Sequence, residues 1–218
     1  MKNRANPEEF FIAGPAGRLQ ALLEHPTVAT RTRAALVCHP HPQHGGTMHN
    51  KVAHTLARAF LRMGFVSLRF NFRGTEESEG RFDDGVGELE DALAALDWLR
   101  VRYPTAPVWL AGFSFGGAIA VRAATLVSVS GLICVAPALE RFADGLDRQP
   151  ECPWLVVQGD KDELVEVDAT INWLNTLQPG PELQILDGAE HFFHGRLIDL
   201  REAVTAFVER THSADSGA

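Results

Sequence analysis

The stretch from Pro107 to Val127, PVWLAGFSFGGAIAVRAATLV, decides the fold prediction. Residues 107–114 form a short apolar run, which is typical of a buried strand. From Phe115 onward the stretch is apolar nearly all round, which predicts a buried helix. Gly112-Phe113-Ser114-Phe115-Gly116 lies at the junction. The sequence therefore predicts a strand, a sharp turn at Ser114, and then a helix.

The same alternation continues on both sides of this stretch. Apolar runs predict further strands at 10–14, 19–25, 34–39, 65–72, 131–138, 154–160 and 182–188, the first two as a hairpin through Gly17. Helical spacing of apolar residues predicts helices at 51–63, 88–100, 167–177 and from 197 onward. Apolar strands between amphipathic helices predict a mostly parallel twisted sheet with helices on both faces. We expect one α/β domain over 1–218, with its core at about 10–210.

The composition of the chain indicates which kinds of partner and cellular location to expect. The chain has 20 Lys and Arg against 28 Asp and Glu, a net charge of −8, so we expect no nucleic-acid partner. The sequence has no apolar run of about 18 residues, so we expect no membrane helix. No apolar segment follows the first basic residues, so we expect no secretory signal. Cys38, Cys134 and Cys152 form no CxxC pair. Buried reduced thiols are the simpler interpretation, and they indicate a cytoplasmic protein.

The turn at Ser114 carries the first candidate catalytic residue. A G-x-S-x-G sequence between strand and helix holds a serine hydroxyl at the top of a sheet, where the helix N-terminus favours a developing negative charge. An inert serine in a glycine-rich turn is the simpler alternative. A dinucleotide-binding turn would need an acidic residue about 20 positions later. Leu132-Ile133-Cys134-Val135 stands there instead.

A nucleophilic serine needs a base, and the base needs an acid that orients it. Asp160 and Asp162 follow the strand predicted at 154–160. His191 and His194 follow the strand predicted at 182–188. All four residues stand at or after the end of a strand. Spacing along the chain therefore does not decide which aspartate is the acid or which histidine is the base.

Two further motifs identify a family resemblance. CHPHPQHGGTMHNKV (38–52) and RFNFRG (69–74) resemble motifs of small lid-less bacterial serine hydrolases, related to dienelactone hydrolases, within the α/β-hydrolase superfamily. The order Ser, Asp, His along the chain is also that of α/β hydrolases. The resemblance covers about residues 10–210 and implies Ser114 as nucleophile, Asp162 as acid and His191 as base, with no cofactor and no metal. Dienelactone hydrolases have a cysteine where this chain has Ser114, so lactone opening does not follow.

An oxyanion hole and a substrate cleft complete the predicted site. The backbone N–H of Phe115 supplies one donor to the hole. The second comes from the loop after 34–39, where prolines leave His41 or Gln43, and we favour His41. Phe113, Phe192 and Arg73 are predicted to line the cleft. The segment from Leu139 to Pro153 is short and polar, with room for one short helix and no apolar lid.

These features predict a serine esterase or thioesterase that acts on a small-molecule acyl ester or thioester. Two alternatives stay open. A zinc-dependent hydrolase is one, because His39-Pro40-His41-Pro42-Gln43-His44 is nearly the zinc signature of metallo-β-lactamase-like enzymes, with Gln43 in place of its aspartate. A non-catalytic protein on the same fold is the other, since a fold does not dictate a function.

Overall fold

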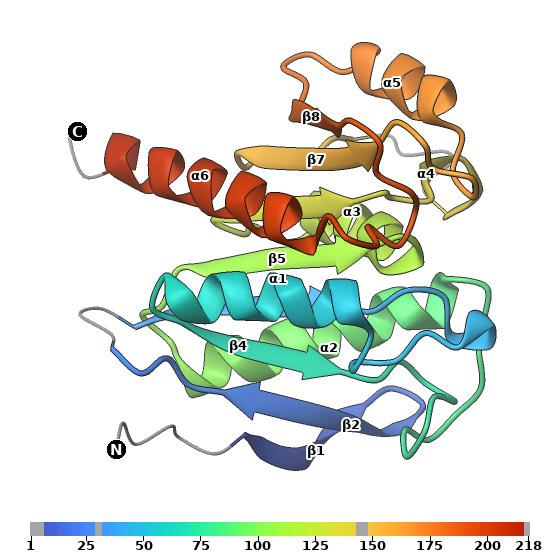
Figure 1. The fold of residues 1–218 in the computed structure, drawn as a ribbon. Helices are drawn as coiled ribbons and strands as arrows, with labels where there is room; N and C mark the ends of the chain where they lie inside the picture. The colour runs from blue at the N-terminus through green and yellow to red at the C-terminus, as the bar shows by residue number, and fades with distance from the viewer. Residues whose placement is uncertain (1–6, 29–31, 143–147, 216–218) are drawn as a thin grey trace.

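A computed structural model describes residues 7–28, 32–142 and 148–215 of the chain (Figure 1). At its centre lies an eight-stranded sheet in the order β1-β2-β4-β3-β5-β6-β7-β8. The strands are β1 (Glu8–Gly14), β2 (Gly17–Glu24), β3 (Arg33–Cys38), β4 (Phe65–Phe70), β5 (Val108–Phe113), β6 (Gly131–Val135), β7 (Trp154–Gly159) and β8 (Glu182–Leu186). Strand β2 is antiparallel to β1 and β4, and the other neighbours are parallel. The expected mostly parallel sheet is confirmed.

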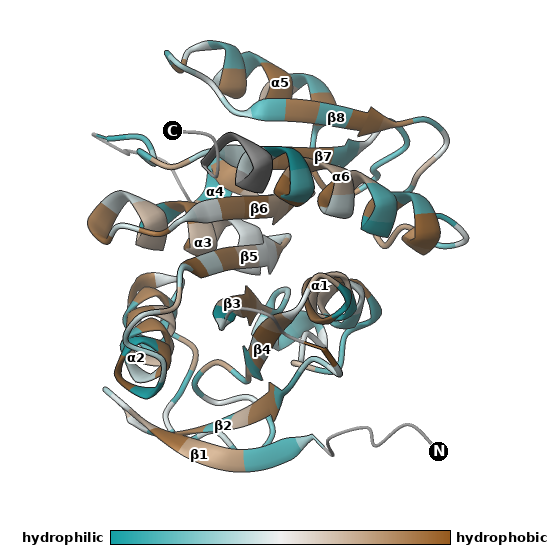
Figure 2. Ribbon diagram, turned by 90° about the vertical axis from the view of Figure 1, so that its left-hand side faces the viewer, coloured by the Kyte–Doolittle hydropathy of each residue, from teal (hydrophilic) through white to brown (hydrophobic). Residues whose placement is uncertain are grey.

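Helices cover both faces of this sheet. They are α1 (Lys51–Arg62), α2 (Val86–Arg102), α3 (Phe115–Leu126), α4 (Leu139–Phe142), α5 (Val167–Asn175) and α6 (Leu197–Asp215), with a short 3₁₀ helix, η1, at Pro42–His44. Helices α1 and α6 lie on one face, and α2 and α3 on the other (Figure 1). Figure 2 shows hydrophobic residues along the central strands and on the helix sides that face them. The result is a three-layer α/β domain.

Burial explains why the central strands have continuous apolar sequences. Every residue of β5, β6 and β7 is buried, because helices exclude water from both faces. Helix α1 begins where the side chain of Asn50 accepts hydrogen bonds from the N–H groups of Val52 and Ala53. Predicted helix bounds differ from the observed ones by one or two residues for the helices that start at Lys51, Phe115 and Val167.

The register of the parallel strands brings their carboxyl ends to one edge of the sheet. Cys38 of β3 pairs with Gly112 of β5, and Gly112 pairs with Cys134 of β6. The segments that follow these strands therefore emerge side by side, together with the segment after β7. This edge is where α/β proteins place their ligand sites.

The predicted opening hairpin is confirmed, with Gly14 opposite Gly17. In the segment predicted to hold one short helix, α4 occupies Leu139–Phe142, and residues 143–147 of that segment lie outside the described residues. Among the residues that the structure describes, no helix is both long and apolar enough to cross a membrane.

Candidate active site

Ser114 sits on a strained turn between β5 and α3. Its backbone has φ +55° and ψ −117°, a region that costs a non-glycine residue about 1–3 kcal/mol. The Ser114 N–H donates to the carbonyl of Val135 at 2.9 Å, which holds the turn against β6. A Cβ at Gly112 would lie 2.1 Å from the carbonyl oxygen of Gly116, and one at Gly116 would lie 2.3 Å from that of His39. The two glycines thus permit a turn that packs against the loop after β3.

His191 and Asp162 form a hydrogen-bonded pair at the same edge. The Nδ1 of His191 lies 3.0 Å and 2.9 Å from the two carboxylate oxygens of Asp162. Both side chains are buried, with 3% and 0% exposed. An Nδ1–H that donates to this carboxylate leaves the lone pair on Nε2, which is the form a general base needs.

Further hydrogen bonds hold Asp162 in its ionised form. Its carboxylate accepts from the side-chain amide of Gln158 at 2.7 Å and from the N–H groups of Leu164 and Val165 at 2.9 and 2.8 Å. Burial raises the pKa of Asp162, but the hydrogen bonds from His191 and the backbone outweigh burial, so the pKa lies below its ordinary value. A buried carboxylate therefore stays charged beside His191.

The two rival residues from the sequence occupy different surroundings. Asp160 accepts a hydrogen bond from the N–H of Gly188 at 2.6 Å, and so ties the loop after β8 to β7. The side chain of His194 is 66% exposed and lies 3.7 Å from the carboxylate of Glu190. Neither is among the residues that line the pocket described below.

The hydrogen bonds of the loop after β3 differ between His41 and Gln43, the two candidate oxyanion donors. The N–H of Gln43 donates to Nδ1 of His41 at 3.2 Å, so Gln43 has no free N–H for a substrate. Within the described residues, the N–H of His41 has no acceptor. Phe115 is the first residue of α3, where backbone N–H groups have no acceptor in the helix. Phe115 and His41 therefore stay the predicted donors of an oxyanion hole.

His39 does not have the free ring nitrogen that a zinc ligand needs. Its Nδ1 lies 2.6 Å from the carbonyl oxygen of Pro40, and its Nε2 accepts from the N–H of Phe72 at 3.0 Å. Burial lowers the pKa of His39 to about 3, so the ring is neutral. Among the described residues, no group of three or more His, Cys, Asp or Glu has the geometry to hold a metal ion. The histidine-rich loop thus has a structural role at His39.

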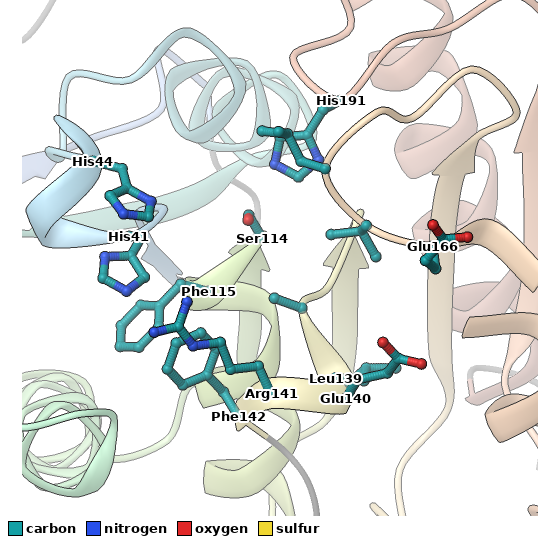
Figure 3. A pocket seen from close by; sticks show the side chains of 13 residues that line it. His41, His44, Ser114, Phe115, Leu139, Glu140, Arg141, Phe142, Glu166 and His191 are labelled. Atoms are coloured by element: carbon teal, nitrogen blue, oxygen red, sulfur yellow. The ribbon is translucent and has the colours of Figure 1, made fainter. Parts of the chain in front are cut away.

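A pocket of about 280 Å³ opens beside Ser114 and His191 (Figure 3). Its apolar lining comes from the segments after β5, β6 and β7: Phe115, Ala138, Leu139, Phe142, Leu164 and Val165. Its polar lining consists of His41, His44, Glu140, Arg141 and Glu166. The pocket therefore combines an apolar surface with ionisable groups next to the serine.

The three residues predicted for the cleft, Phe113, Phe192 and Arg73, are not among those that line this pocket. Phe113 is fully buried and packs behind His191, with ring centroids 5.0 Å apart. Phe192 packs edge-on against His191 and borders a different pocket. Arg73 is only 6% exposed and pairs with Asp91, its Nη2 lying 2.8 Å from Oδ1. Arg73 fixes the segment after β4 to α2 instead of facing a substrate.

The sequence motifs did not identify the other residues that line the pocket, because those residues follow strands but belong to no motif. Leu139, Arg141 and Phe142 follow β6, and Leu164, Val165 and Glu166 follow β7. The rule that sites collect at carboxyl ends of parallel strands would have identified both segments.

Comparisons with known proteins identify the family of the chain. A family model described as X-Pro dipeptidyl-peptidase (S15 family) matches residues 16–143, which include Ser114 and end before Asp162 and His191. An uncharacterized protein of Rickettsia prowazekii (strain Madrid E) is 32% identical over 210 residues, covering 92% of this chain and 88% of that protein.

Two solved structures are closer in sequence. An alpha-beta serine hydrolase homologue from Coxiella burnetii is 44% identical, covers 94% of this chain and 97% of its own, and superposes with a TM-score of 0.87. A serine hydrolase without a lid from Xanthomonas campestris is 42% identical, with 94% and 95% coverage and a TM-score of 0.90. The chain therefore shares both sequence and fold with lid-less serine hydrolases.

Proposed function

We propose that this chain, which belongs to the S15 family and so to the α/β-hydrolase superfamily, is a serine esterase or thioesterase for small acyl substrates. Ser114 is the nucleophile, His191 the general base and Asp162 the acid that orients it. One observation carries the proposal: the strained Ser114 and His191, which is hydrogen-bonded to Asp162, border one pocket.

The reaction follows from the roles of these groups. The Ser114 Oγ attacks the acyl carbonyl and gives its proton to Nε2 of His191. His191 then passes that proton to the leaving alcohol or thiol as the bond to it breaks, which leaves an acyl-enzyme. Water attacks the acyl group with His191 again as base, and Ser114 recovers its proton as the acid product departs. The charge on Asp162 stabilises the imidazolium in both halves of the reaction.

The negative oxygen that forms in each half is stabilised by the N–H groups of Phe115 and His41. Donors of this kind contribute about 3–4 kcal/mol each in a well-formed hole. The bond between Gln43 and the ring of His41 supports His41 over Gln43 as the second donor.

The pocket favours small substrates. Its volume of about 280 Å³ is at the lower end for small-molecule sites. Each buried methylene contributes only about 0.8 kcal/mol, and an open pocket buries few of them. We expect short acyl chains to be hydrolysed faster than long ones. The cytoplasmic location is part of this proposal and rests on Cys38, Cys134 and Cys152, which are all unpaired.

The decisive experiment is labelling with a fluorophosphonate, followed by intact mass and peptide mapping. We expect a single adduct at Ser114, and none in Ser114→Ala. Turnover is then measured on a panel of p-nitrophenyl esters and thioesters of increasing chain length. The panel also includes an X-Pro p-nitroanilide, because the matching family model is that of an X-Pro dipeptidyl-peptidase. We expect this amide to be hydrolysed more slowly than the short esters.

Each alternative predicts a different result. A zinc hydrolase would lose activity to a chelator and show no serine adduct. A non-catalytic protein would show neither adduct nor turnover. A sharp rate increase above the micelle threshold, or a preference for long acyl chains, would instead indicate a lipase.

A further inference from the structure

We propose that one side of the pocket is an anion subsite, formed by the Nε2–H of His41 and the guanidinium of Arg141, which selects esters that carry a carboxylate or another anionic group. This inference rests on the proposed esterase function and deepens it by naming a substrate class. Figure 3 shows His41, His44 and Arg141 along one side of the pocket and Glu140 and Glu166 along the other.

The hydrogen bonds of His41 fix which nitrogen carries its proton. Its Nδ1 accepts from the N–H of Gln43 at 3.2 Å. Burial, followed by the nearby charges of His44 and Arg141, lowers the pKa of His41 to about 4 against a smaller opposing effect of Asp84, so the ring is neutral at pH 7. A neutral imidazole whose Nδ1 accepts must carry its hydrogen on Nε2. His41 is therefore a donor through Nε2–H.

That donor lacks a partner. The Nε2 of His41 is buried without a hydrogen bond in the described structure, and the whole residue is only 8% exposed. An unsatisfied buried donor costs about 1–3 kcal/mol. The ring is held rigidly, because it stacks on His44 at 4.3 Å and contacts Phe115 at 5.1 Å. An oxygen atom of a bound ligand would satisfy this donor.

Arg141 supplies the charge next to that donor. Its guanidinium lies 5.0 Å from the centre of the Phe142 ring, and the side chain is exposed at the pocket. Among the described residues, Arg141 has no carboxylate partner. Because His41 and Arg141 both line the pocket, a ligand bound there can contact both. The Arg141 guanidinium and the Nε2–H of His41 both lack an acceptor, and together they form a site for an anion.

The opposite side of the pocket sets the orientation of the substrate. Glu140 and Glu166 are both exposed there, and they repel an anionic group. An ester with an anionic end should thus bind in one direction only, with that end toward Arg141. The anion can belong to the acyl chain or to the leaving group, and the chemistry of recognition is the same for both.

Two matched substrate pairs distinguish these sources. Monomethyl glutarate and methyl valerate differ by a carboxylate at the end of the acyl chain. Para-acetoxybenzoate and para-acetoxybenzamide differ by a carboxylate on the leaving group. For each pair we compare kcat/KM of the anionic ester with that of the neutral ester. We expect one of the two ratios to favour the anion in the wild-type protein and to fall as ionic strength rises.

Substitutions then test the two donors. Arg141→Gln should lower the favoured ratio about fivefold, which corresponds to about 1 kcal/mol for a partly exposed charge pair, and Arg141→Lys should restore part of it. His41→Asn keeps an acceptor for the Gln43 N–H but has no donor at the position of Nε2, and should lower the ratio about tenfold. Arg148→Gln is the matched control, because Arg148 is exposed outside this pocket and should leave both ratios unchanged.

Binding gives a readout that does not depend on turnover. Glutarate should raise the melting temperature of Ser114→Ala, and the added Arg141→Gln change should abolish that rise. Equal ratios in the wild-type protein and Arg141→Gln, with ester turnover intact, would overturn the subsite and leave the esterase proposal standing. Stabilisation by glutarate through Arg141, without any ester turnover or serine labelling, would uphold the subsite and overturn the esterase.

Discussion

Two loops at the carboxyl edge of the sheet carry histidines, and the rings of these histidines have different hydrogen-bond partners in the two loops. In the loop after β3, His39 bonds to the carbonyl of Pro40 and the N–H of Phe72, and His41 accepts from the N–H of Gln43. In the loop after β8, His191 bonds to the carboxylate of Asp162. The first loop has more histidines, yet the second holds the candidate base.

The difference lies in the partner of each ring. Backbone partners fix an imidazole in place, and burial then lowers the pKa values of His39 and His41 to about 3 and about 4. A carboxylate partner stabilises the imidazolium that forms when a base takes a proton. The rings of His39 and His41 are thus held neutral, whereas His191 is suited to take up and return a proton. The density of histidines in a sequence does not distinguish these two roles.

Removing His191 should have the largest effect. His191→Ala should lower kcat for a short ester by about 10⁴-fold, as should Ser114→Ala, because each removes a member of one catalytic unit. His194→Ala is the matched control from the same loop and should keep nearly full activity. An active His191→Ala together with an inactive His194→Ala would move the base to His194.

Changing the carboxylate partner should come next. Asp162→Asn should lower kcat by about 10³-fold or more, because an amide favours the wrong tautomer of His191. Asp160→Asn should change kcat far less, although it weakens the bond from the Gly188 N–H. Steady-state kinetics on both variants decides the acid. The reverse ranking would assign that role to Asp160.

Displacing the loop after β3 should have a smaller effect on catalysis. In Gly46→Ala, the new Cβ would lie 2.1 Å from the carbonyl oxygen of Pro40, so the loop and the His41 N–H must shift. Loss of one oxyanion donor lowers kcat by about 10²-fold. Gly45→Ala is the neighbouring control, since nothing lies within 4 Å of its Cβ and only its positive φ of +77° adds strain. Equal losses in both variants would argue against His41 as a donor.

Acid should lower the stability of the protein through His39. The pKa of His39 is about 3 in the folded protein and about 6.5 when unfolded, so the unfolded state binds more protons between these values. Stability should therefore fall as pH drops through this window, by up to about 1.4 kcal/mol per pH unit. His39→Gln keeps an acceptor for Phe72 and should reduce that slope in urea unfolding from pH 7 to 4. An unchanged slope would place the acid sensitivity elsewhere.

The fold was predictable because its signals are local. Apolar runs and helical spacing identify each strand and helix, and the G-x-S-x-G turn places Ser114 between β5 and α3. The Ser–Asp–His order and the two family motifs suggested Asp162 and His191, which lie 29 residues apart and meet in the structure. Spacing along the chain could not separate Asp162 from Asp160. The difference is the direction of each side chain, which the turn after β7 sets.

The cleft was predicted poorly for a related reason. Phe113 precedes Ser114 directly, but neighbouring residues at the end of a strand point to opposite faces, and Phe113 faces the layer of α1 and α6. Arg73 stands in a family motif, but its role depends on Asp91, a partner 18 residues away on α2. Proximity to a motif therefore says little about contact with a substrate.

The position of β8 at the edge of the sheet has a consequence for synthesis of the protein. Strand β8 is the last strand in the chain and pairs only with β7, and the loop behind it carries His191. A chain emerges from the ribosome N-terminus first, and Ser114 precedes His191 by 77 residues. On the proposed assignment, a partly made chain has a serine without a base and cannot hydrolyse anything. The enzyme would thus become active only after the last strand and the loop behind it have been synthesised.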